Sequence, residues 1–173
     1  MSRLGPEGNR MSSSNRMSRL VGKLDSLPAG LRTAVQSFLL GRKVPFVGTA
    51  KLKVEEVSQW RVVVSIRNRR RVQNHIKGVH AAAMALLAET ASGFAVGMHV
   101  PDDRIPLIKS MKIDYVKRAK GDLRAVVELR PEHVQAIFSE EKGEINVPVS
   151  VTDQSGTPPI LCDVIWAWIP RRA

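Results

Sequence analysis

The sequence has few of the residues and motifs on which common enzyme chemistries depend. Cys162 is the single cysteine in 173 residues, which excludes an internal disulfide framework and suits a reducing compartment. The phosphate-binding P-loop, the Gly-x-Gly-x-x-Gly turn and the Gly-x-Ser-x-Gly elbow are all absent. The histidines and the cysteine show no spacing typical of metal ligands. We therefore expect no metal site and no resident cofactor.

Aromatic residues and membrane signals are scarce as well. One Tyr and four Phe leave the basic segments without the stacking platforms that bind single-stranded nucleic acid. Residues 1–26 contain no apolar core of a secretory signal. The one long apolar run, residues 81–96, is interrupted by Glu89, and a central acid costs about 3 kcal/mol on membrane insertion. We expect no membrane span.

Positive charge is concentrated in the first half of the chain. The net charge is +11, with 15 Lys and Arg against four acids in residues 1–75 and 12 of each in residues 76–173. Such an excess attracts nucleic acid, an anionic membrane surface or a phosphate-rich ligand, and charge alone does not choose among them.

Residues 1–26 are rich in Ser, Arg, Gly and Asn, a composition typical of a disordered leader. We expect this leader to precede a single domain, residues 27–173, in a cytoplasmic protein. Glu7 is the only acid before Asp25, so a transit peptide for the mitochondrial matrix is the alternative.

Periodicity predicts the elements of the domain. Apolar residues at spacings of three and four predict a short amphipathic helix between residues 27 and 40, with Gly41 ending it and a turn at 45–48. Its apolar face consists of Leu31, Ala34, Val35 and Phe38. Alternation predicts strands at residues 49–56, 60–66, 107–117, 123–129, 145–151 and 160–169. The expected hairpin turn is residues 120–122, residues 131–141 form a connection, and Pro148 indicates a sheet edge.

Residues 81–96 are apolar on every side, which predicts a buried helix with an antiparallel sheet wrapped around it, an α+β fold. One helix cannot cover such a sheet completely, so we expect a dimer. Glu89 is the only charge in the run, and burying an unpaired carboxylate is costly. It either has a chemical role or forms a hydrogen bond across the dimer.

Two motifs carry a resemblance to a known family. Asn74, Gly78 and His80 are followed, nine residues after the His, by Glu89 within Leu-Leu-Ala-Glu-Thr-Ala, and residues 113–122 read Ile-Asp-Tyr-Val-Lys-Arg-Ala-Lys-Gly-Asp. This pattern resembles the hotdog-fold acyl-CoA thioesterases, particularly the phenylacetyl-CoA thioesterase-like group. The resemblance implies a hotdog fold, a homodimer or tetramer, and hydrolysis of an acyl-CoA to free acid and coenzyme A.

The resemblance also implies roles for individual residues. Glu89 of one subunit acts as general base or nucleophile, facing the helix-terminal amides near Gly78 of the other subunit, which bind the oxyanion. Thr90 positions the water with Glu89. Asn74 orients the carbonyl or the water, or is simply a turn residue, and His80 is either a base or a packing and hydrogen-bonding residue at the helix entry.

Basic clusters offer sites for the phosphates of coenzyme A. The candidates are Arg67, Arg69, Arg70 and Arg71, and the later pair Lys117 and Arg118. A solvated surface is the alternative for each cluster.

One departure from the family pattern keeps a second function open. Glycines often follow the His, whereas Ala81 and Ala82 do so in this chain. Their methyl groups favour, as the alternative, a non-catalytic hotdog module that binds acyl-CoA or lipid. A basic nucleic-acid-binding protein is favoured by charge alone.

Overall fold

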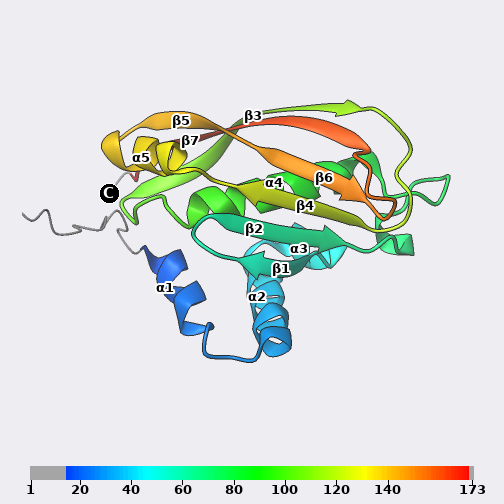
Figure 1. Ribbon diagram of the computed structural model, residues 1–173, viewed down its shortest axis with the longest axis horizontal. Coiled ribbons are helices and arrows are strands. Elements are labelled where there is room, and N and C mark those ends of the chain that lie inside the picture. The colour runs from blue at the N-terminus through cyan, green and yellow to red at the C-terminus, as the bar shows by residue number, and fades with distance from the viewer. Residues whose placement is uncertain (1–14, 172–173) are drawn as a thin grey trace, which may run out of the picture.

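A computed structural model describes residues 15–171 and shows an antiparallel sheet curved around a central helix (Figure 1). The four-stranded part of the sheet has the order β1-β2-β4-β6, and the three-stranded part has the order β3-β7-β5. The strands are β1 Lys53–Val57, β2 Arg61–Ile66, β3 Arg104–Tyr115, β4 Leu123–Glu128, β5 Gly143–Val147, β6 Val149–Asp153 and β7 Ile160–Pro170. The helices are α1 Arg16–Lys23, α2 Ala29–Lys43, α3 Pro45–Ala50, the short 3₁₀ helix η1 Arg70–Val72, α4 Ala81–Gly97 and α5 Pro131–Ser139.

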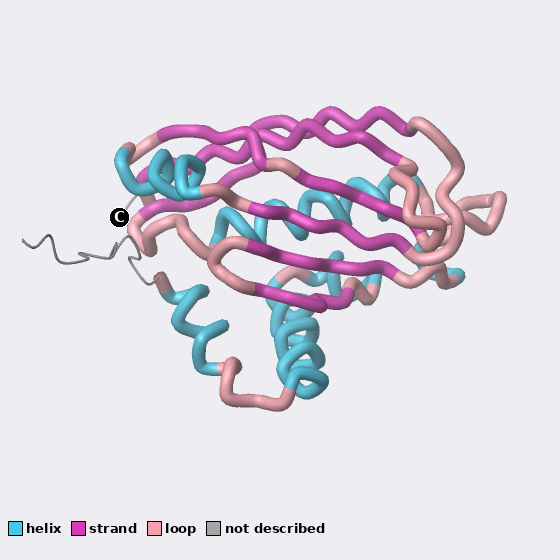
Figure 2. Tube along the Cα trace, in the orientation of Figure 1, coloured by secondary structure: helices cyan, strands magenta, loops and turns pink. Residues whose placement is uncertain are grey.

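Pro148 joins the two parts of the sheet. The chain leaves β5, which pairs with β7, and enters β6, which pairs with β4, across this one residue. Proline cannot donate to a ladder, so pairing is interrupted there and the chain passes from one part to the other. The prediction of one continuous strand over residues 145–151 is therefore wrong. Figure 2 shows the curved wall of strands that results.

Helix α4 lies on the inner side of this wall and contacts β2, β3, β4, β6 and β7. The α+β class and the central helix are confirmed. The prediction that α4 is buried on every side is not confirmed for the single chain. One stripe of the helix, made of three small residues and one acid, is at least partly exposed. The stripe consists of Ala82, Ala85, Glu89 and Gly93.

The β7 strand holds α4 in place through Trp166. Its indole N–H donates to Ser92 Oγ at 2.9 Å, and both residues are buried. A Cβ at Gly93 would lie 2.7 Å from the indole ring, so only glycine allows the ring to pack there. The helix is thus fixed one turn beyond Glu89.

Helix α2 forms where the periodicity predicts it, but the opposite face is buried. Gln36 is buried, and Ser37 Oγ accepts the N–H of Val54 at 3.0 Å, at the free edge of the sheet. Leu31, Ala34 and Phe38, which belong to the predicted apolar face, are exposed. Covering the strand edge requires polar groups, and this tertiary demand overrides the helical pattern.

The described part of the expected leader is ordered. Asn15 Nδ2 donates to the carbonyls of Gly97 and Val100 at 2.7 and 2.6 Å, its Oδ1 caps α1 by accepting the N–H of Ser18, and Val21 is buried in the core. A disordered leader reaching residue 26 therefore differs from the structure. The prediction for residues 1–14 lies outside the described residues.

Three smaller predictions were wrong. Gly41 does not end α2: it is the point where α2 and α3 cross, since a Cβ on Gly48 would lie 2.6 Å from the Gly41 carbonyl oxygen. Residues 131–139 form helix α5 instead of an irregular connection. The turn at 120–122 does not close a hairpin, because β3 pairs with β7 and β4 pairs with β2 and β6.

Between residues 15 and 171, no helix is both long and apolar enough to cross a membrane.

Candidate functional site

The loop before α4 is built on Asn74. Its Oδ1 accepts the backbone N–H groups of Ile76 and Gly78 at 3.1 and 3.0 Å, and its own N–H donates to the Gly78 carbonyl at 2.9 Å. Asn74 is therefore a turn residue, as the alternative interpretation held. Its Nδ2 has no partner within residues 15–171, so the same side chain still has a donor for a substrate or water.

Further contacts fix the loop from both sides. The Arg118 guanidinium donates to the Ile76 carbonyl at 2.8 Å, and Asn68 Nδ2 donates to the Lys77 carbonyl at 3.1 Å. Lys77 has a φ of 60°, the left-handed conformation that a tight turn needs. Arg118, predicted to bind phosphate, uses its guanidinium at least partly to hold this loop.

His80 is the N-cap of α4. Its Nδ1 accepts the N–H of Ala82 at 3.0 Å, and its carbonyl accepts the N–H groups of Ala83 and Met84. A ring that accepts at Nδ1 carries its neutral-state proton on Nε2. Three of the four amides that begin the helix are thus satisfied, and the one without an acceptor in the described chain is the N–H of Ala81.

Tyr115, the last residue of β3, also contacts Ala81, although it was not among the predicted site residues. Its hydroxyl donates to the Ala81 carbonyl oxygen at a distance of 3.2 Å. The signal was present in the sequence, since Tyr115 belongs to the second motif, residues 113–122. The bond ties the first residue of α4 to the edge strand.

Glu89 lies on the partly exposed stripe of α4. The hydroxyl of the buried Thr90 donates to Glu89 Oε2 at 3.5 Å, a long and weak hydrogen bond. Burial raises the pKa of the Glu89 carboxyl above its ordinary value, and the bond from Thr90 opposes the shift. A carboxylate with few partners and a raised pKa is a stronger base than an ordinary carboxylate.

A single chain does not bring Glu89 and the helix entry together. His80 and Glu89 are nine residues apart on one helix, about 13.5 Å along its axis at the helical rise. Asn74, Gly78, His80 and Ala81 form one cluster, and Glu89 with Thr90 forms a second. One substrate carbon cannot touch both clusters of the same chain.

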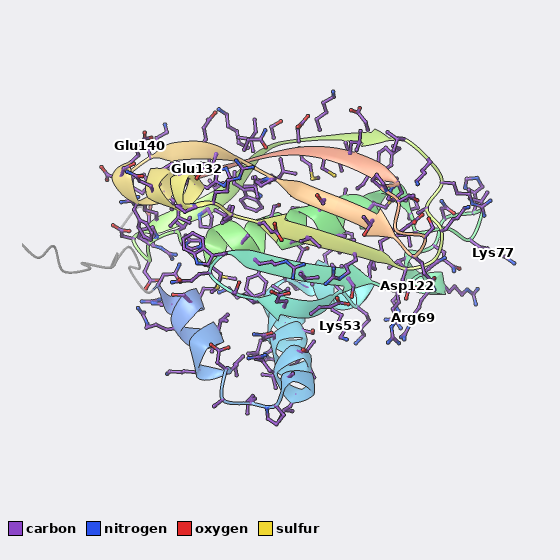
Figure 3. The ribbon with its side chains drawn as sticks, viewed as in Figure 1. Lys53, Arg69, Lys77, Asp122, Glu132 and Glu140 are labelled. Carbon is purple, nitrogen blue, oxygen red and sulfur yellow. The ribbon has the colours of Figure 1, made fainter. Side chains whose placement is uncertain are left out.

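Of the predicted phosphate ligands, Arg67 and Arg69 line a basic cavity. This basic cavity has a volume of about 180 Å³ and is lined by Ala50, Lys51, Lys53, Arg67 and Arg69. Its four cations form no ion pair within the described chain. Figure 3 shows Lys53 and Arg69 at the same end of the molecule as Lys77 of the Asn74 loop. Arg70, Arg71 and Lys117 are exposed and do not line this cavity.

Two further partly or fully buried titratable groups of residues 15–171, His99 and Cys162, are poorly suited to catalysis. His99 is buried, its Nε2 lies 2.6 Å from the Gln59 carbonyl, and burial lowers the pKa of the ring. Burial also raises the pKa of the Cys162 thiol to about 11, which makes it a poor nucleophile. No group of three His, Cys, Asp or Glu residues in the described chain is arranged to hold a metal ion.

Solved structures with the same fold include several named thioesterases. A protein of unknown function from Pseudomonas aeruginosa, named "Probable Thioesterase", is 24% identical over 80% of this chain and 96% of that chain, with a TM-score of 0.72. A mutant thioesterase from the same organism is 14% identical over 79% and 93%, with a TM-score of 0.64. A thioesterase family protein from Silicibacter pomeroyi is 11% identical over 80% and 99%, with a TM-score of 0.63.

These similarities show that the chain has the same fold as these structures, the hotdog fold. No curated protein matches the sequence. The model of one family does match, over residues 32–169, which include the Asn74 loop, α4 and all seven strands except the last residue of β7. The chain therefore belongs to the family described as Domain of unknown function (DUF4442).

Proposed function

We propose that the protein is an acyl-CoA thioesterase whose active site is shared between two subunits. The observation that carries the proposal is the N–H of Ala81 at the entry of α4, which has no acceptor within residues 15–171. It combines a free donor with the positive end of the helix dipole, the arrangement that stabilises an oxyanion. Solved structures of the same fold that are named thioesterases support it.

Glu89 of one subunit supplies the base for a substrate held at Ala81 of the other. Its carboxylate takes a proton from water as the water oxygen bonds to the thioester carbon. The carbonyl electrons move to oxygen, where the Ala81 N–H binds the oxyanion. When the oxyanion collapses, the carbon–sulfur bond breaks and Glu89 returns the proton to the leaving thiolate. Attack by Glu89 itself, through an anhydride that water then hydrolyses, is the alternative route.

The dimer that this mechanism needs has a candidate interface at β3. This strand is the outer strand of its part of the sheet, and its exposed side chains include Leu107, Ile108 and Tyr115. A long apolar edge of this kind favours pairing with a second copy. Pairing β3 with β3 places the two central helices on one continuous sheet, with the Glu89 stripe of each facing the other copy.

The basic cavity is our proposed site for the phosphates of coenzyme A. Lys51, Lys53, Arg67 and Arg69 surround it and form no ion pair within residues 15–171, so their charge is available to a polyanion. Of the predicted arginine cluster, the proposal keeps Arg67 and Arg69 and leaves out Arg70 and Arg71, which do not line the cavity. Lys117 stays a prediction. Charge reversal at Lys51 and Lys53 is expected to raise KM for acyl-CoA and to leave kcat unchanged.

A non-catalytic acyl-CoA-binding module is the second candidate, favoured by the two alanines after His80. Ala81 and Ala82 are exposed in the single chain, so their methyl groups project where an acyl group would lie. Such a module would bind the same ligands without turnover.

Thiol release from short, medium, long and aromatic acyl-CoAs separates the two candidates. Loss of a general base costs about 10²–10⁴-fold in rate, which is the loss we expect for Glu89→Gln. The matched control is Glu132→Gln on α5, an exposed acid at the opposite end of the molecule from Lys77 (Figure 3). Turnover by the wild-type protein no greater than that of Glu89→Gln would support the binding module.

A further inference from the structure

The exposed face of α2 is apolar and belongs to no proposed part of the catalytic site. Leu31, Ala34 and Phe38 follow one another at spacings of three and four, so they form one stripe, and Phe38 is 67% exposed. The polar side of the helix is the buried one, because Gln36 and Ser37 face the edge of the sheet. An exposed apolar stripe of this kind indicates an interaction surface.

The segments on either side of α2 in the chain add exposed apolar side chains and positive charge. Phe46 of α3 is 60% exposed, and Leu20 of α1 is exposed as well. Residues 16–53 hold eight Lys and Arg against a single acid, Asp25, which pairs with Arg32 at 3.3 Å. Residues 54–171 hold 16 Lys and Arg against 14 Asp and Glu. The net charge of the described chain therefore lies mainly on this segment.

Arg42 and Lys43 place that charge beside the stripe. Arg42 lies four residues after Phe38 on the same face of α2, and Lys43 ends the helix. Neither forms an ion pair within residues 15–171. Apolar side chains next to unpaired cations match a surface that is apolar inside and anionic outside.

The helices α1 and α2 and the turn between them, residues 16–43, form a helical hairpin. We propose that this hairpin, together with Phe46, docks the protein on an anionic lipid bilayer. Leu31, Phe38 and Phe46 enter the boundary between headgroups and acyl chains. Arg42 and Lys43 remain at the level of the lipid phosphates, each contributing electrostatic attraction. This inference does not depend on thioesterase activity, because none of these residues belongs to the proposed catalytic site.

Other occupants fit the surface less well. A second copy that placed hairpin against hairpin would bring two strongly basic segments together. The proposed dimer also leaves the hairpin open, since the hairpin projects from the side of the molecule opposite β3 (Figure 1). Nucleic acid would match the charge, but it offers no apolar phase for Leu31 and Phe38.

Flotation of the full chain with lipid vesicles tests the proposal. We expect binding to vesicles of equal parts phosphatidylcholine and phosphatidylglycerol to be at least about tenfold tighter than to phosphatidylcholine alone, and to weaken with salt. The variant Leu31→Ser with Phe38→Ser removes the apolar anchors, and Arg42→Glu with Lys43→Glu reverses the charge. Each is expected to weaken binding by about tenfold or more.

Two controls match these changes in type but lie elsewhere on the surface. Leu161→Ser alters an exposed apolar residue of β7, and Lys142→Glu reverses an exposed charge after α5. Both are expected to bind like the wild-type protein, and circular dichroism verifies that every variant is folded. Equal binding to neutral and anionic vesicles would overturn the proposal, and so would unchanged binding by the hairpin variants. A change of oligomeric state in those variants without vesicle binding by the wild-type protein would assign the surface to a second copy.

Discussion

The Nδ1 of His80 accepts the backbone N–H of Ala82 at 3.0 Å. This bond makes His80 the cap of the central helix and leaves the preceding amide, that of Ala81, without an acceptor in the described chain. A histidine held in this way has its Nδ1 lone pair occupied, so it is poorly placed to act as the base of the reaction. The base in our proposal is therefore Glu89.

Substitution of His80 separates capping from catalysis. Asn caps helices well, so His80→Asn is expected to keep the stability and to retain turnover within about tenfold of wild type, well short of the 10²–10⁴-fold loss for a missing general base. His80→Ala loses the cap and is expected to lower the free energy of unfolding by about 1 kcal/mol in urea titrations. A His80→Asn protein that is stable but has lost turnover as fully as Glu89→Gln would restore His80 as a catalytic residue.

Two glycines are expected to respond oppositely to alanine. At Gly78 a Cβ would meet nothing closer than 3.8 Å within the chain, so Gly78→Ala should change stability by less than about 0.5 kcal/mol while lowering turnover, because the substrate approaches there. At Gly93 a Cβ would collide with Trp166, so Gly93→Ala should cost about 1–3 kcal/mol of stability. Urea titrations and thiol release measure both effects. Full activity in Gly78→Ala would remove Gly78 from the site.

The raised pKa of Glu89 predicts opposite effects of pH on rate and on stability. Only the carboxylate accepts a proton, so the rate should rise with pH through a pKa above the ordinary value of 4.5. The folded state holds this proton more tightly than the unfolded state does, so stability falls as pH rises from 4.5 through the folded-state pKa. Glu89→Gln removes that loss, and its melting temperature should exceed that of wild type at neutral pH.

The comparison of melting temperatures has an internal control. Well below pH 4.5 Glu89 is protonated in both states, so the stability gain of Glu89→Gln over wild type should disappear. A gain that persisted unchanged at acid pH would mean that its cause is packing, and the pKa argument would fail.

The β3 edge is expected to control both assembly and activity. Leu107→Glu with Ile108→Glu places charges on the proposed interface, so light scattering should report a monomer, and thiol release should be lost with the dimer. Phe38→Ser, on the opposite side of the molecule, should remain dimeric and active. An active monomer would show that one chain holds a complete site.

The central helix and most strands could be predicted because their patterns are local. The apolar run of residues 81–96 became α4, and alternation located β2, β4 and β7. The buried face of α2 could not be predicted, because Ser37 binds Val54 of a strand 17 residues away. The pairing of β3 with β7 could not be predicted either, because paired residues such as Met111 and Val164 are distant in sequence.

The residues of the candidate site that belong to a sequence motif could be predicted. The contacts that these residues make could not. Asn74, Gly78 and His80 lie together as their spacing implied, but only the structure showed that Asn74 and His80 use their side chains to hold the turn and the helix entry. The Ala81 N–H that lacks an acceptor within residues 15–171 and the hydrogen bond from Tyr115 both depend on three-dimensional packing, which the residue pattern does not reveal. The basic cavity escaped prediction because Lys51 and Arg69 are far apart along the chain.

Ala81→Pro gives a variant that removes the proposed oxyanion donor alone. Ala81 is the first residue of α4, a position where proline is well tolerated, and His80 has an extended conformation that suits a following proline. Loss of one such donor is worth about 10²–10³-fold in rate. Glu89→Gln removes the base, so each variant alone is expected to be nearly inactive.

Mixing these two variants is the most direct test of an active site shared between subunits. After joint refolding, half of the dimers are mixed, and each mixed dimer has one intact site, formed by Ala81 of one chain and Glu89 of the other. Thiol release should therefore recover to about a quarter of the wild-type rate. A mixture that stays as inactive as its two components, although mixed dimers are detected, would contradict the shared site.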